Sequence, residues 1–197
     1  LAGSTFGYAI IAMLIGGIRY WREVGGGAPA PSPIVDTAVD ILTLRNLGGG
    51  GHGCNDVDDS FSSQKRWLHQ AAFYGFMMCF AATTAGAVYH HILGLRSPHP
   101  FWSLPVQLGT WGGVLLCLGT AGLIRLKIIT DPVPVAKRLV GGEYAMLSLL
   151  FLVSATGLLL LVVRHTGAMG VMLALHLGLV LALFVAMPYS KMVHGVY

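Results

Sequence analysis

Two neighbouring stretches decide the fold class of this chain: YAMLSLLFLVSATGLLLLVV at residues 144–163 and AMGVMLALHLGLVLALFVAM at residues 168–187. Each is 20 residues long, and neither contains Asp, Glu, Lys or Arg. A helix needs about 20 predominantly apolar residues to cross the roughly 30 Å hydrocarbon core of a bilayer. Each stretch is therefore predicted to be a transmembrane helix.

Three further apolar stretches lie upstream, at residues 5–18, 67–93 and 104–124. The whole chain is 55% apolar and only 10% charged, whereas charged residues make up about 25% of a soluble domain. This composition excludes a soluble globule, and it also excludes a disordered chain, which would be poor in apolar residues and rich in charge. Because backbone in lipid must satisfy its own hydrogen bonds, the sequence predicts an all-α integral membrane helical bundle with about five transmembrane helices.

On this interpretation the chain has three parts. Residues 1–22 are expected to form the first transmembrane helix, clipped at its start. Residues 23–66 are expected to form a cytoplasmic loop rich in Gly and Pro, and residues 67–197 a four-helix transmembrane core. The composition of the loop is typical of a flexible linker, and a docking surface for a cytoplasmic partner is the alternative.

Lys and Arg are concentrated in two loops, which indicates how the helices are oriented. The first and second stretches are joined through Arg19, Arg22, Arg45, Lys65 and Arg66, and the third and fourth through Arg125, Lys127, Lys137 and Arg138. The connections on the other side carry only Arg96 and Arg164. The protein is therefore expected to be multi-pass, with both basic loops and the C-terminus in the cytoplasm.

Histidine is the unusual residue of this apolar chain, which contains 8 of them. Ionisable side chains inside membrane spans are costly and are therefore functional candidates. His176 lies within the last span, and His194 follows 18 residues later, five whole turns along and about 27 Å away. His69 lies at the cytoplasmic start of the second span, and His90 and His91 lie at its outer end.

These positions form two pairs at two depths, because the second and last spans are antiparallel. Neutral imidazole is a usual axial ligand of haem iron, and helical bundles build such sites from facing helices. The pairs predict two b-type haems, with His69 and His194 on the cytoplasmic iron, and His176 with His90, or alternatively His91, on the outer one. The alternative for each ring is an ordinary hydrogen bond between helices or contact with water.

Three cations near these histidines are candidates for pairing with haem propionates: Arg66, Arg164 and Lys191. The alternative is that they mark topology and extend their charged ends to the membrane surface. No catalytic side chain is expected.

Several long motifs carry a resemblance to known families. Residues 176–197, HLGLVLALFVAMPYSKMVHGVY, resemble the last helix of the di-haem cytochrome b subunit of respiratory nitrate reductases. In that helix an internal histidine is followed by Pro-aromatic-Ser-basic-x-x-His. A closer resemblance, to the membrane part of the tricarballylate utilisation protein B (CitB) family, covers almost the whole chain. Its motifs are GGGGHGC, KRWLHQAAFYGFMMCFA, AVYHHILG, PHPFWSLPVQLGTWGG, RHTGAMG and PYSKMVHGVY.

The resemblance implies an electron-transfer subunit of a quinone-linked oxidoreductase in a bacterial inner membrane, rather than a stand-alone enzyme. Such proteins pass electrons from a cytoplasmic flavoprotein dehydrogenase toward quinone, and any iron–sulfur cluster would lie in an upstream domain or a partner. By carry-over, His176 and His194 match the ligands of the last helix, and His69 and His90 take the second-helix role. The rival interpretation is a haem-free structural subunit that acts as a scaffold in a larger membrane complex.

Overall fold

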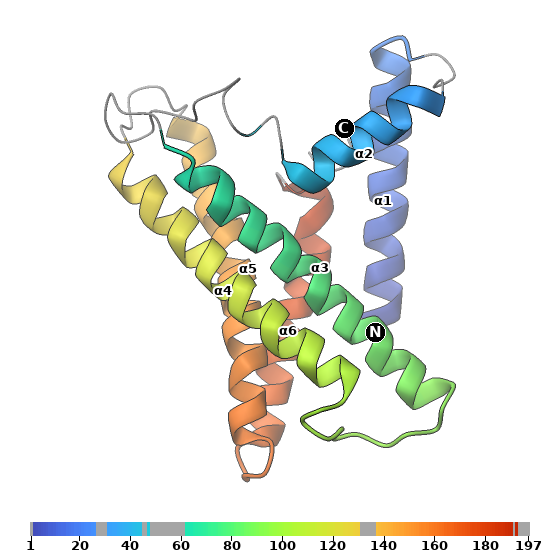
Figure 1. Cartoon of the computed structure of the whole chain (residues 1–197), viewed down its shortest axis with the longest axis vertical. Helices are drawn as coiled ribbons and strands as arrows, with labels where there is room; N and C mark the ends of the chain where they lie inside the picture. Colours follow the sequence, from blue (N-terminus) through green and yellow to red (C-terminus); the bar gives the residue numbers. More distant parts are fainter. Residues whose placement is uncertain are drawn as a thin grey trace.

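The computed structural model describes residues 2–26, 31–44, 47, 62–130, 137–190 and 192. Figure 1 shows that this part of the chain is mainly helical. In chain order they are α1 (Ala2–Glu23), α2 (Pro31–Thr43), α3 (Gln64–His91), α4 (Leu104–Ile129), α5 (Lys137–Val163), α6 (Met169–Ala186) and the short 3-10 helix η2 (Met187–Tyr189).

Four of the described helices are long and apolar enough to cross a membrane: Gln64–His91, Leu104–Ile129, Gly141–Val163 and Met169–Tyr189. They coincide with the last four predicted spans to within a few residues, which confirms the all-α membrane bundle. The first predicted span lies within α1, and its crossing of the membrane stays a prediction.

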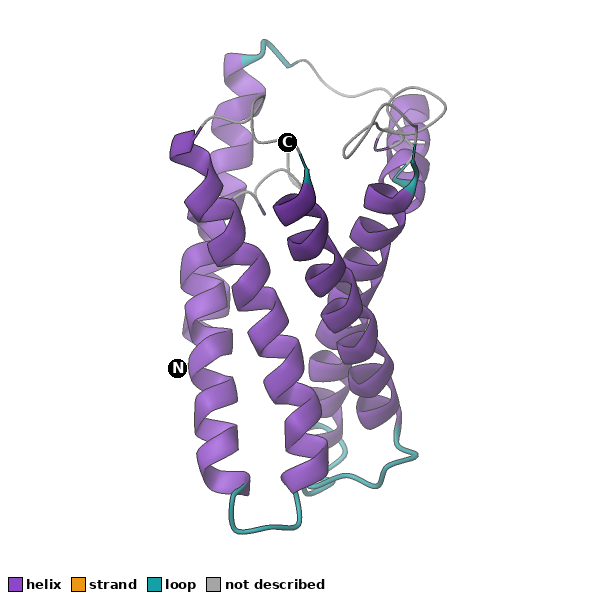
Figure 2. Cartoon of the chain, turned by 90° about the vertical axis from the view of Figure 1, so that its left-hand side faces the viewer, coloured by secondary structure: helices purple, strands orange, loops and turns teal. Residues whose placement is uncertain are grey.

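The four spanning helices form two antiparallel hairpins, α3–α4 and α5–α6. Helix α3 packs chiefly on α4, α4 on α5, and α5 on α6, while α1 lies against α6. Both hairpin loops lie at the same end of the molecule, at the lower edge of Figure 2. Consequently the start of α3 and the end of α4, with Lys65, Arg66, Arg125 and Lys127, meet at the opposite end. We refer to it as the basic end.

The turn after α3 depends on one glycine. Gly94 has a φ of 65°, in the left-handed region that glycine adopts without a steric penalty. The backbone N–H of the next residue, Leu95, donates to the carbonyl of Tyr89 at 2.9 Å. This bond satisfies a carbonyl in the last turn of α3 and directs the chain into the hairpin loop.

Glycines bring α3 and α4 into backbone contact. A Cβ on Gly75 would lie 2.4 Å from the backbone nitrogen of Leu116, and one on Gly119 would lie 2.5 Å from that of Ala72. Small residues allow this approach, which is a common packing device between membrane helices. The seam fixes the rotation of α3 against α4, and with it the direction in which the histidine-bearing face of α3 points.

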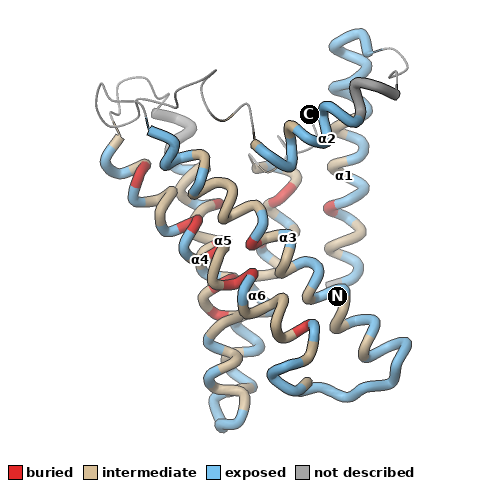
Figure 3. Tube along the Cα trace, in the orientation of Figure 1, coloured by how far each residue is buried: buried red, intermediate tan, exposed pale blue. Residues whose placement is uncertain are grey.

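A small apolar core lies inside the bundle. Its buried members come from α4, α5, α6 and η2, and they are Leu116, Met146, Leu150, Leu183 and Met187. Phe76 of α3 and Met13 of α1 pack against this cluster. Figure 3 shows buried segments in the middle of the molecule and exposed ones along α1, α2 and the hairpin loops.

Most of the spanning surface is uncovered, as expected of helices that face lipid. Only 6% of the apolar window of α6 is buried inside the structure. Val171 of α6 is 78% exposed, and Trp102, just before α4, is 84% exposed. Apolar side chains at this exposure need a hydrocarbon environment or further protein around them.

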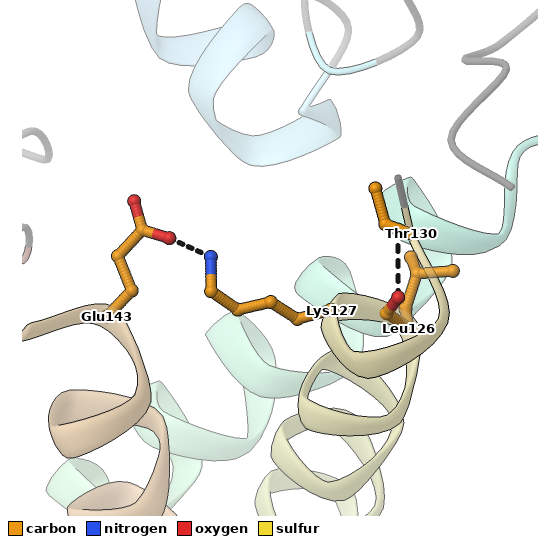
Figure 4. Close-up of polar contacts among 4 residues, drawn as sticks. All are labelled: Leu126, Lys127, Thr130 and Glu143. Atoms are coloured by element: carbon orange, nitrogen blue, oxygen red, sulfur yellow. Dashed lines mark hydrogen bonds and ion pairs between the residues drawn. The ribbon is translucent and has the colours of Figure 1, made fainter. Parts of the chain in front are cut away.

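An ion pair joins α4 to α5 at the basic end (Figure 4). The Lys127 ammonium donates to the Glu143 carboxylate, and both side chains are partly buried, at 21% and 16% exposed. The same ammonium lies 5.5 Å from the ring centroid of Tyr144. The pair neutralises the carboxylate at the start of a spanning helix, where an unpaired charge would be costly.

Helix α2 lies within residues 23–66, the segment expected to be a cytoplasmic loop rich in Gly and Pro. Its two prolines, Pro31 and Pro33, fall in the first turn, where the missing N–H groups have no partner inside the helix. In that position the two prolines are compatible with the start of a helix. Much of the remaining loop, including the glycine run at residues 48–51, lies outside the described residues.

Candidate functional site

His69 lies in the second turn of α3, at the basic end. Its side chain is partly buried, and its Nδ1 atom is shielded from solvent. A separation of seven residues is close to two helical turns, so His69 shares a face of α3 with Phe76. Because Phe76 packs against the core cluster, His69 lies on the core-facing stripe of α3.

His176 lies in the third turn of α6, toward the end with the hairpin loops. It shares a face with Leu183, seven residues later, and Leu183 is a buried member of the core cluster. His176 therefore lies on the core-facing stripe of its own helix. The two stripes meet the same apolar cluster, with His69 and His176 toward opposite ends of the bundle.

The ring of His176 is positioned by two consecutive residues of α5. Its Nδ1 lies 3.0 Å from Oγ1 of Thr156, which is itself only 6% exposed. A Cβ on Gly157 would lie 3.1 Å from Cε1 of the ring. The absence of a side chain at Gly157 thus allows the imidazole to lie close to α5, within reach of Thr156.

The hydrogen bond between Thr156 and His176 is compatible with a proton on Nδ1 of the ring. The Thr156 hydroxyl donates to the carbonyl of Leu152 at 2.7 Å. Its oxygen is then available to accept from Nδ1–H of His176, which leaves the lone pair on Nε2. This is the tautomer that an imidazole uses when it binds a metal through Nε2 while its other nitrogen donates to a protein group.

His90 and His91 lie in the last turn of α3 and are exposed. Their rings contact each other edge to face, with centroids 4.9 Å apart. The described hydrogen bond of the His176 ring is with Thr156. The choice between His90 and His91 stays open.

His194, the predicted partner of His69, lies outside the described residues, as does Lys191. The other two candidate propionate partners are described, and both donate to backbone carbonyls. Arg66 donates to the carbonyl of Thr43 at 2.9 Å, and Arg164 reaches that of His99 at 3.5 Å. In this arrangement each arginine joins two segments of the chain, and its pairing with a propionate stays a prediction.

Within the described ranges, no three His, Cys, Asp or Glu side chains are grouped as ligands for a metal ion. A haem iron with two axial histidines does not require such a group, because the porphyrin supplies the remaining ligands. An axial ligand of haem is a single, partly buried imidazole whose Nε2 carries the lone pair. The side chain of His176 is compatible with this description. Thr156 was missed by the sequence analysis, although a hydroxyl beside a glycine within an apolar span was a signal for it.

Comparisons with known proteins agree with the motifs. A sequence model of the family described as "Citrate utilization protein B" matches residues 1–197. The chain belongs to this family. A relative from Escherichia coli named citrate utilization protein B is 44% identical over 196 residues, which is 99% of this chain.

The aligned region is only 52% of that relative, so the chain spans about half its length. No solved structure matches the chain. The family assignment confirms the resemblance to the CitB family.

Proposed function

We propose that the chain is a membrane-anchored di-haem b-type electron-transfer subunit, which passes electrons from a cytoplasmic flavin or iron–sulfur dehydrogenase partner to quinone. The observation that carries this proposal is the pair of partly buried histidines, His69 and His176, on stripes that face one core from two helices. The family name points to citrate or tricarballylate utilisation. The partner dehydrogenase would then oxidise a substrate of this class.

The proposed ligands are His69 with His194 near the basic end, and His176 with His90 or His91 near the other. A bound haem would supply one-electron redox chemistry at iron. The role of the chain is to hold neutral imidazoles at two depths and to keep bulk water away from them with apolar helices. In this role Thr156 would hold the proton on Nδ1 of His176, and the Gly75–Gly119 seam would set the direction of His69.

The basic end is proposed to face the cytoplasm, in accordance with the positive-inside rule. A soluble electron donor would then approach the side where α3 begins and α4 ends. In this orientation His69 would be nearer to the donor, and His176 would be nearer to the outer surface, where the quinone would be reduced.

The haem proposal is tested by a reduced-minus-oxidised spectrum of the protein purified in detergent. We expect the α and Soret bands of low-spin b-type haem, and a pyridine haemochrome assay that approaches two haems per chain. A folded protein with no haem bands would reject the proposal.

The second candidate function is a haem-free scaffold subunit of a larger membrane complex. It is favoured by the bond between His176 and Thr156, because an interhelical hydrogen bond already satisfies one nitrogen of the ring without a cofactor. The same spectrum decides between the two functions, since a scaffold would fold and show no haem bands.

Substitution of Thr156 with valine is predicted to raise the midpoint potential of one haem and leave the other unchanged. Without the Thr156 oxygen to accept from Nδ1–H, the imidazole becomes a weaker electron donor, which disfavours the ferric state. Retention of that haem should also weaken, because loss of such a partner typically costs roughly 10-fold or more in metal affinity. Potentiometric titration followed at the haem bands measures both effects.

Thr120→Val is the matched control. Thr120 is fully buried, and its hydroxyl bonds to the carbonyl of Leu116 in its own helix at 2.7 Å. The Thr120→Val substitution should leave both midpoint potentials unchanged. The Thr156→Ser substitution should keep the midpoint potential of the parent protein, because it retains the hydroxyl. Equal shifts in Thr156→Val and Thr120→Val would contradict the positioning role of Thr156.

A further inference from the structure

Helix α2 has an apolar face that the rest of the described chain leaves uncovered. Val35 is 65% exposed, Val39 is 49% exposed and Leu42 is 52% exposed. Their spacing of four and then three residues places them on one side of the helix, and Asp36 and Asp40 lie on the other. The helix is therefore amphipathic, with its apolar side unpartnered.

Two bonds attach the C-terminal end of α2 to a spanning helix. Tyr74 of α3 donates its hydroxyl to the carbonyl of Leu42 at 2.7 Å, and Arg66 donates to that of Thr43 at 2.9 Å. Both carbonyls belong to the last turn of α2 and have no partner inside it. These bonds hold the C-terminal end of α2 beside the N-terminal part of α3, between Arg66 and Tyr74.

The first turns of α3 lie where the membrane surface is expected. Trp67, between Arg66 and the apolar part of α3, is 68% exposed, and such tryptophans are enriched at the level of the lipid headgroups. Figure 1 shows α2 running across this end of the molecule, at a large angle to α1. This position is that of a helix in the plane of the membrane surface.

We propose that α2 is an interfacial helix whose apolar face, formed by Val35, Val39 and Leu42, enters the boundary between lipid headgroups and acyl chains. The C-terminal end of this face lies beside α3, to which α2 is bonded. The opposite face, with Asp36 and Asp40, contacts water. This inference does not depend on haem binding.

The attraction is apolar rather than electrostatic. Residues 31–43 contain two Asp and no Lys or Arg, so the helix itself has no cation to bind anionic lipid. Burial of apolar side chains at the boundary supplies the affinity. A zwitterionic phosphatidylcholine membrane should therefore be sufficient to bind the apolar face of α2.

Spin labels test the orientation of α2 in the full chain. Single cysteines replace Val35, Val39, Asp36 or Asp40 in a background where Cys54, Cys79 and Cys117 are serine, and the protein is reconstituted into phosphatidylcholine nanodiscs. Collision rates are measured with oxygen, which concentrates in lipid, and with a neutral nickel chelate, which stays in water. A label at Val171, exposed on α6, is the lipid reference.

Labels at Val35 and Val39 should collide more often with oxygen than with the nickel chelate, as the label at Val171 does. Labels at Asp36 and Asp40 should collide more often with the nickel chelate. If all four labels are equally open to nickel, the helix is in water and the proposal is wrong. If the Val35 and Val39 labels are protected from both reagents, a protein surface covers the face, and the proposal is also wrong.

Discussion

Substitution of His176 with alanine is expected to reduce the haem content of the purified protein to about half. The change removes one proposed axial ligand and leaves the other proposed pair, near the basic end, unchanged. The reduced-minus-oxidised spectrum should keep its band positions at half the amplitude, and the pyridine haemochrome should approach one haem per chain. His69→Ala should remove the other haem.

The control for this prediction is His165→Ala. His165 is exposed in the loop between α5 and α6. The His165→Ala protein should therefore retain both haems. In the same assay, only one of His90→Ala and His91→Ala should reproduce the loss seen with His176→Ala. An unchanged haem content in His176→Ala would reject the assignment of this residue, even if the parent protein contains haem.

Substitution of Gly119 with alanine is expected to destabilise the bundle strongly for so small a change. The new Cβ would lie 2.5 Å from the backbone nitrogen of Ala72 and 2.8 Å from the carbonyl oxygen of Leu68. Both atoms are backbone, so no side-chain rotation relieves the contact, and α3 and α4 must separate. Overpacking of this kind typically costs about 1–3 kcal/mol and sometimes more.

The loss of stability is measured as the midpoint of unfolding when SDS is titrated into the protein in mild detergent. Gly178→Ala is the matched control, because a Cβ on Gly178 of α6 has nothing within 4 Å. It should unfold at the midpoint of the parent protein. Equal midpoints for Gly119→Ala and the parent protein would show that α3 and α4 do not approach as closely as described.

The core-facing stripes were partly predictable from the sequence. Periodicity places His176 with Leu183, and His69 with Phe76, but it does not show that these faces turn inward. In a soluble helix the apolar face marks the core. In a membrane helix every face is apolar, because lipid and protein interior are similar in polarity.

The same limit applies to the glycines and to α2. Gly119 and Gly178 both lie within predicted spans, yet only the first is in close contact with a neighbouring helix. The prolines at the start of α2 were consistent with both a linker and a first helical turn. The bonds from Tyr74 and Arg66 connect residues far apart in the sequence, so local pattern did not indicate them.

The sequence by itself determined the four long spans, their alternating direction and the concentration of cations at one end. These properties follow from the length and charge of each segment, because each helix satisfies its own backbone hydrogen bonds in lipid. The tertiary structure decided which faces meet, and therefore that His176 is bonded to Thr156 and that His69 faces the core. The physical reason is that helices in an apolar solvent associate through shape and hydrogen bonds, and these depend on atoms from two helices at once.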